Sequence, residues 1–171
     1  MMTHARTVAL VLAAALAVTV TGQTPAASQT SASRQIPGIT AKDVYPNGCV
    51  DCHVAGKDGD IRLSTLMAKW TTAVPAALAD KAKASSADPS KIKGKHLPMP
   101  NVKANTPQTC LAGCHKKGST MAPPFAQLMH AIHLTGGGQN RFLSVNQGEC
   151  THCHKLDQKT GAWKMPSGAE K

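Results

Sequence analysis

The sequence has few of the large apolar side chains from which a protein core is ordinarily built. Its 171 residues include two Trp, one Tyr and two Phe. After Gly22, Leu, Ile, Val and Phe make up 22 of 149 residues, or about 15%. Chains with less than about 20% of these residues and a high net charge normally stay disordered, because they bury too little apolar surface to offset the entropy of folding. An enzyme with a large core of its own side chains is therefore disfavoured: either the chain is disordered, or something other than side chains fills its centre.

The sequence also lacks an apolar run long enough to cross a membrane. The longest run, Val8–Val20, has 13 residues, whereas a spanning helix needs about 20. It follows a short segment with one positive charge, Arg6, and precedes Thr21-Gly22, which is typical of a cleaved secretory signal. We expect residues 1–22 to be a signal peptide, with a second candidate cleavage point after Ala32. The mature protein is then expected in the periplasm or outside the cell, with no integral membrane segment.

Acidic residues are scarce as well. The chain has 9 Asp and Glu against 19 Lys and Arg, for a net charge of +10. Outside the cytoplasm a basic protein does not meet nucleic acid, so we expect no nucleic-acid partner.

The organisation predicted from composition is a flexible leader over residues 23–41, rich in Thr, Ala, Ser, Gln and Pro, and one domain over residues 42–171. Apolar periodicity predicts helices over residues 61–70, 76–84 and 123–132. Pro123-Pro124 suits the start of the last helix, and three Gly at 136–138 end it. No alternating pattern is long enough to predict a strand, and residues 85–94 are expected to be a loop. The predicted fold class is mainly α, with a few short helices and long loops.

All six Cys fall in three pairs, and each pair is followed at once by His. C-x-x-C-H is the attachment site of c-type haem. Each thiol adds to one vinyl group, and the following His reaches the iron as proximal ligand. The middle pair has one extra residue between its cysteines, an exception to this spacing. We therefore expect three covalently bound haem c groups on the motifs Cys49, Cys52, His53; Cys110, Cys114, His115; and Cys150, Cys153, His154.

Three other uses of the cysteines are weaker. Disulfides suit an exported protein but give no reason for a His after every pair. Structural zinc sites do not fit pairs spaced so far apart. A thioredoxin-like pair requires a βαβ context that the sequence does not offer.

The remaining histidines match the number of distal positions. His4 lies in the signal and His152 between two cysteines, where an exposed or propionate-bonding role is expected. His96, His130 and His133 are then the candidate distal ligands of the three irons. Alternatives stay open: His96 could be a loop residue, and either helix histidine could bond a propionate. Met is the competing ligand, and it would raise the potential; the candidates are Met99, Met121, Met129 and Met165.

The three motifs resemble a small multihaem, here trihaem, cytochrome c. The segment 129–133, followed by 150–154 and 163–166, is similar to haem-binding segments of the decahaem cytochromes of metal-reducing bacteria. In that family a His-x-x-His helix upstream of C-x-x-C-H supplies distal ligands, which the resemblance transfers to His130 and His133. It implies a fold of short helices wrapped around the haems, so that the cofactors supply the missing core.

The predicted function is electron transfer between redox partner proteins, such as periplasmic or outer-membrane cytochromes or a reductase. An iron with two His ligands has no vacant position for a substrate, so we expect no enzymatic activity. The alternative is a small multihaem reductase, or a haem subunit of a larger respiratory complex, with one open or Met-ligated haem. No Cys pair is followed by the Lys that marks the catalytic haem of multihaem nitrite reductases. The Lys clusters at 91–95 and 116–117 are either solvated surface or an encounter surface for an acidic partner.

Overall fold

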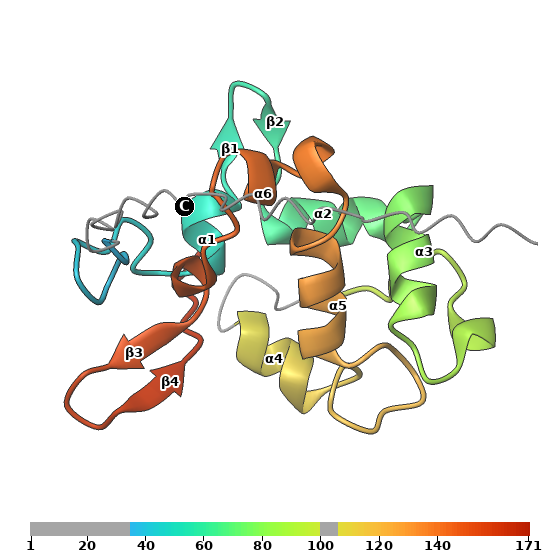
Figure 1. The fold of residues 1–171 in the computed structure, drawn as a ribbon. Helices are drawn as coiled ribbons and strands as arrows, with labels where there is room; N and C mark the ends of the chain where they lie inside the picture. The colour runs from blue at the N-terminus through green and yellow to red at the C-terminus, as the bar shows by residue number, and fades with distance from the viewer. Residues whose placement is uncertain (1–34, 100–105) are drawn as a thin grey trace, which may run out of the picture. The chain divides into compact units, whose positions relative to one another are not determined.

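The fold is known from a computed structural model that describes residues 35–99 and 106–171 (Figure 1). The expected signal peptide and most of the expected leader lie outside the described residues. Within the described part of the chain, no helix is long and apolar enough to cross a membrane.

The described residues form short helices and two small antiparallel hairpins. The α-helices are α1 (Cys49–Cys52), α2 (Leu63–Trp70), α3 (Ala76–Ala84), α4 (Thr106–Ala112), α5 (Phe125–His133) and α6 (Arg141–Ser144). The 3₁₀ turns are η1 (Pro89–Lys91), η2 (Gly137–Gln139) and η3 (Cys150–His152). In the hairpins, β1 (Ala55–Gly56) pairs with β2 (Gly59–Asp60), and β3 (Lys155–Asp157) pairs with β4 (Ala162–Lys164).

The three helices expected from periodicity are present as α2, α3 and α5. Pro75 and Pro124 stand directly before α3 and α5 in extended conformations, with ψ of 137° and 132°. Proline is tolerated at such starts because the first helical N–H groups have no partner within the helix.

The end of α5 is held by a side chain that the sequence did not single out. The Asn140 amide donates hydrogen bonds to the carbonyls of Ile132, His133 and Thr135, at 2.9, 2.9 and 2.8 Å. The Lys81 ammonium, from α3, also reaches the Ile132 carbonyl at 3.2 Å. These donors satisfy the carbonyls that a helix leaves open at its C-terminus.

The expectation of no strands is wrong. Each hairpin strand is only two or three residues long, so no alternating pattern can develop along it. Turn glycines mark the hairpins instead: Gly59 and Gly161 have φ of 120° and 68°. The segment expected as a loop, residues 85–94, also contains the turn η1. The described chain is therefore mixed, with short helices and two small hairpins.

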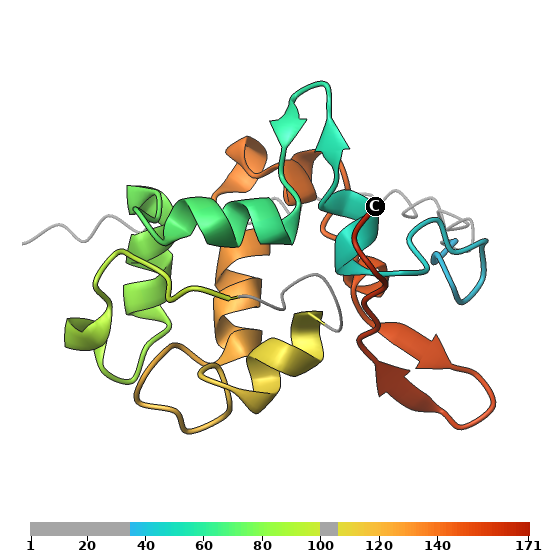
Figure 2. The ribbon, with the colours of Figure 1, turned by 180° about the vertical axis from the view of Figure 1, so that it is seen from behind.

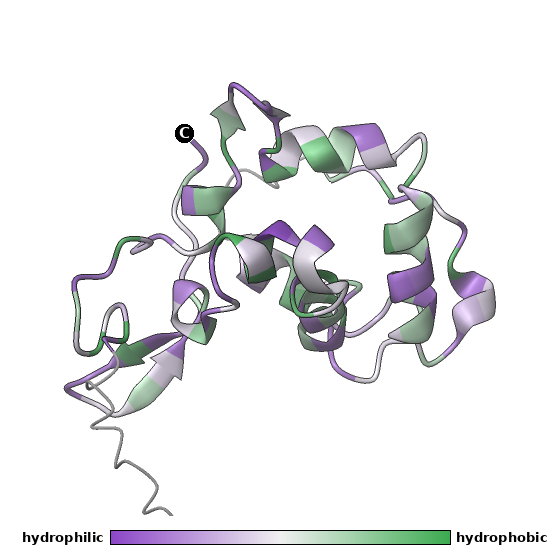
Figure 3. Ribbon diagram, turned by 45° about the horizontal axis from the view of Figure 1, so that its top comes forward, coloured by the Kyte–Doolittle hydropathy of each residue, from purple (hydrophilic) through white to green (hydrophobic). Residues whose placement is uncertain are grey.

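The side-chain core is small. Among the described residues, the buried core hydrophobics are Val50, Ala79 and Phe125. Several large apolar side chains are instead more than half exposed: Val44, Leu97, Met121, Val145 and Trp163. Figure 3 shows hydrophilic and hydrophobic residues interleaved along the helices. The composition argument thus holds for the folded chain, because its own side chains make only a minor core.

α5 lies between α3 and α4 and contacts both, as two opposite views show (Figures 1 and 2). The C-terminal segment returns to the first Cys pair: Ser167 bridges to Gly48, and Lys171 binds Asp51 at 3.1 Å. Gly48 has a φ of 61°, and a Cβ there would clash with the Pro166 carbonyl. The first and last parts of the described chain therefore meet at α1.

Candidate functional site

The first and last Cys pairs each sit on a single helical turn. The backbone N–H of His53 donates to the Cys49 carbonyl at 2.9 Å, and that of His154 donates to the Cys150 carbonyl at 2.8 Å. Each bond spans four residues, as in an α-helix. None of the six cysteines forms a disulfide in the described part of the chain.

The middle pair accommodates its extra residue by a wider turn. The N–H of His115 donates to the Cys110 carbonyl at 3.2 Å, which spans five residues instead of four. Such π-type turns are frequent at functional sites. The first cysteine and the histidine therefore keep their mutual hydrogen bond despite the longer motif.

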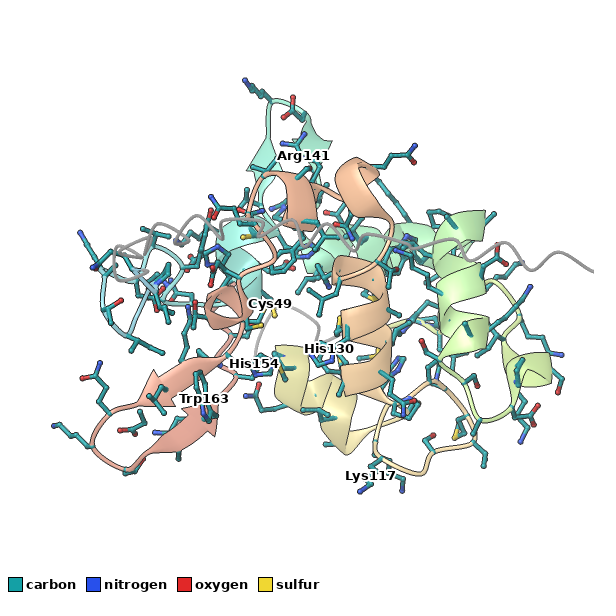
Figure 4. All side chains as sticks on the ribbon, viewed as in Figure 1. Cys49, Lys117, His130, Arg141, His154 and Trp163 are labelled. Atoms are coloured by element: carbon teal, nitrogen blue, oxygen red, sulfur yellow. The ribbon has the colours of Figure 1, made fainter. Side chains whose placement is uncertain are left out.

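Each histidine that follows a Cys pair lies against one of the three remaining candidate histidines. The ring centroids are 6.2 Å apart for His53 and His133, 6.0 Å for His115 and His96, and 6.1 Å for His154 and His130. Figure 4 shows His154 beside His130 on α5, close to Cys49. We call these pairs, with their cysteines, the first site (Cys49, Cys52, His53, His133), the middle site (Cys110, Cys114, His115, His96) and the last site (Cys150, Cys153, His154, His130).

Four of these six imidazoles are oriented through Nδ1 by backbone carbonyls. His53 binds the Ile61 carbonyl at 2.9 Å and His115 that of Pro123 at 2.6 Å. Among the histidines outside the Cys motifs, His133 binds the Met129 carbonyl at 2.9 Å and His96 binds the Leu97 carbonyl at 2.7 Å. A carbonyl accepts only from a protonated nitrogen, so these bonds place the proton on Nδ1 and leave Nε2 free to bind a metal.

The loop that orients His53 is itself anchored. Ile61 follows Asp60, whose carboxylate accepts from Arg62 Nη2 at 2.6 Å and from Thr65 Oγ1 at 2.8 Å. These bonds tie hairpin β1–β2 to the start of α2 and hold the pKa of Asp60 well below its usual range. The first site is thus supported by a hydrogen-bonded turn together with Val50, the fully buried side chain between its two cysteines.

Burial favours the neutral forms of the imidazoles and thiols at these sites. It lowers the pKa of His53 and of His115, which favours the neutral imidazole that metals require. It raises the pKa of Cys49 to about 11, with the neighbouring thiols of Cys153 and Cys110 adding to the effect. A thiol with a raised pKa is a weak nucleophile and a poor redox catalyst, which argues against a thioredoxin-like function.

His152 differs from its expected exposed position. Its side chain is buried, with its ring 4.5 Å from that of Tyr45 and 6.2 Å from that of Phe142. The exposed role is therefore wrong, because these two rings cover it. Its Nδ1 is buried without a partner among the described residues, and bonding to a propionate stays a prediction. Nothing in the sequence pattern marked Tyr45 or Phe142 as its neighbours.

Of the four candidate methionines, Met121 is 65% exposed. Each pair of imidazoles could hold one metal ion between two ring nitrogens. No group of three or more His, Cys, Asp or Glu suited to a metal ion occurs in the described part of the chain. No protein-family model, no curated protein and no solved structure matches this chain.

Proposed function

We propose that this chain is an exported trihaem c-type cytochrome that relays electrons between redox partner proteins. The observation that carries the proposal is the pairing of every motif histidine with one further histidine at about the same ring separation, from 6.0 to 6.2 Å.

That separation fits two imidazoles on opposite sides of one metal. Bonds from nitrogen to metal are about 2 Å, and a coordinating nitrogen lies about 1 Å from the centre of its ring. Two ligands facing each other across an ion therefore have centroids about 6 Å apart. All three pairs satisfy this condition. Aromatic contacts in general range from about 4.5 to 7 Å, so the support comes from every motif histidine having its own histidine partner at this separation.

The residues of each site have distinct roles in the proposal. The cysteines hold the haem covalently, the motif histidines are proximal ligands, and His96, His130 and His133 are distal ligands. Haem bound in this way supplies one-electron chemistry at iron. Since a histidine occupies each side, no coordination position remains for a substrate. No observation favours the alternative of a reductase with an open or Met-ligated site.

The spacing of the sites supports a relay. His130 and His133 lie three residues apart on α5, so the last and first sites border one helix turn. The Cys49 thiol is close enough to those of Cys153 and Cys110 for each to raise its pKa. Thiols from all three sites therefore lie near one another, as electron transfer between the proposed haems requires.

The test is to replace single histidines in the mature protein carrying its haems. His96→Ala, His130→Ala and His133→Ala should each convert one haem from low to high spin, read by EPR and optical spectra. His152→Ala is the matched control and should leave all haems low spin, since His152 faces Tyr45 and Phe142. Unchanged spectra in a distal variant would disprove that ligand, and a preparation without covalent haem would disprove the function.

A further inference from the structure

The net positive charge of this chain is concentrated in one stretch of sequence. The 60 residues from Pro89 to Gly148 contain no Asp or Glu, while they contain six Lys and one Arg. All nine acidic residues lie outside this stretch. The described residues before Pro89 contain equal numbers of basic and acidic residues, six of each. The positive field is therefore local and not spread evenly over the molecule.

The middle site brings two parts of this stretch together. His96 directly follows Lys95, and His115 directly precedes Lys116 and Lys117. The two imidazoles stack with centroids 6.0 Å apart and planes inclined by 13°. His96 is fixed in place by its N–H, which donates to the Trp70 carbonyl at 2.8 Å. Lysines separated by about 20 residues in sequence thus border the same site.

The lysines nearest the middle site are not neutralised by acidic groups. Lys95, Lys116 and Lys117 are exposed, and none is in an ion pair within the described part of the chain. Lys117 projects away from the ribbon in Figure 4. Farther along the cluster, Lys91 is paired with Asp88 at 3.4 Å.

The other two sites have acidic groups beside them. In the first site Asp51 lies between the two cysteines, and its carboxylate is paired with Lys171 at 3.1 Å. Beside the last site, Lys155 is paired with Asp43 at 2.9 Å, and both side chains are mostly buried. Only the middle site of the three therefore combines exposed lysines with no acidic neighbour among the described residues.

We propose that the lysine-bordered middle site is where this chain docks an acidic redox partner protein, an inference that rests on the proposed electron-transfer function. Clustered charge of one sign raises the association rate of an oppositely charged partner, and salt screens that effect. Docking there places the partner next to one of the three proposed haems. The competing use of these lysines is to balance the chain's own haem propionates, and the experiment separates the two.

The experiment uses the mature trihaem protein and a reduced acidic flavodoxin as the probe partner. Stopped-flow rates of electron transfer are measured at low and high ionic strength for the parent protein and two charge-reversal variants. Lys95→Glu/Lys117→Glu alters the middle site. Lys57→Glu/Lys159→Glu is the matched control, because these exposed lysines lie in the turns of the two hairpins and the net charge changes equally.

The docking variant should lose about tenfold in rate at low salt and the control less than about twofold, with all three proteins converging at high salt. Carbodiimide coupling of flavodoxin carboxylates should give cross-links to Lys95, Lys116 or Lys117, identified by mass spectrometry. Equal losses in both variants, or cross-links elsewhere, would overturn the proposal. A rate loss explained by a shift in midpoint potential would do the same, since it would indicate propionate pairing.

The Lys95→Gln/Lys117→Gln variant serves where charge reversal prevents folding, with a smaller loss of the same sign expected. Haem content is measured on every preparation. If three haems are present and the electron-transfer rates of the two variants do not differ, the docking surface alone is refuted. If no covalent haem is present, both the proposed function and the docking surface are refuted.

Discussion

The first and last sites take their second histidine from one helix, whereas the middle site does not. His133 and His130 both come from α5, and the motif histidines opposite them close four-residue turns. The middle site takes His96 from an extended segment anchored to the Trp70 carbonyl, and its motif closes a five-residue turn. Equivalent histidine pairs are thus built in two ways. The middle site contacts the start of α5, where the Phe125 N–H donates to the His115 carbonyl at 2.9 Å. Damage near the C-terminal end of α5 should therefore affect the first and last sites more than the middle one.

The largest effect expected is loss of the fold when no haem is attached. The buried core hydrophobics of the described chain are Val50, Ala79 and Phe125, which is too little to offset the entropy of ordering the chain. Protein made without the attachment machinery should show no cooperative unfolding transition by circular dichroism, in either the α5 region or the middle region. A cooperative transition in the haem-free chain would contradict this account.

Breaking α5 should separate the two kinds of site. Ala131→Pro removes a helical hydrogen bond between the two histidines and should cost about 3 kcal/mol. The last and first sites should become high spin by EPR, and the middle site should stay low spin. Ala126→Pro is the control, since proline is tolerated in the first helical turn. Loss of low-spin signal at all three sites in the Ala131 variant would show that the middle site also depends on α5.

Removing the cap of α5 is a milder form of the same test. Asn140→Ala removes the amide that donates to three carbonyls, of which those of Ile132 and Thr135 keep the Lys81 ammonium. It should lower the free energy of unfolding by about 2 kcal/mol in a denaturant titration. The distal ligand His133 should be released at lower denaturant than the ligands of the middle site. Exposed Gln139→Ala is the control; a loss of equal size there would show that the cap contributes nothing specific.

The helix positions and the cysteine turns could be predicted from sequence because each is local. Pro75 and Pro124 mark helix starts, and the Cys–Cys–His spacing fixes its own hydrogen bonds. The pairing of His96 with His115, and of the two α5 histidines with sites far along the chain, depends on tertiary placement that no local pattern encodes. The hairpins escaped prediction because strands of two or three residues carry no periodicity, and His152 was misplaced because Tyr45 and Phe142 approach it from distant segments.

Acidification should give the smallest and most gradual effect. Burial lowers the pKa of His53 and His115 in the folded chain. Ligation to the proposed haem irons would act in the same direction, because metals bind neutral imidazole. The unfolded chain therefore binds more protons as the pH falls below about 6.5. The stability from these two neutral imidazoles is present above that pH and is lost as the pH falls toward the folded pKa. Denaturant unfolding between pH 7.5 and pH 5 should show this decline at the first and middle sites. A free energy of unfolding that increases on acidification would contradict this prediction.

The proposed electron-transfer function depends most on three histidine pairs that each hold one iron. The direct measurement is the EPR spectrum of the oxidised mature protein together with a quantitative haem assay. The pairing predicts three covalent haems per chain, all low spin and with no high-spin signal at neutral pH. Fewer than three haems, or a high-spin signal from the intact protein, would contradict it.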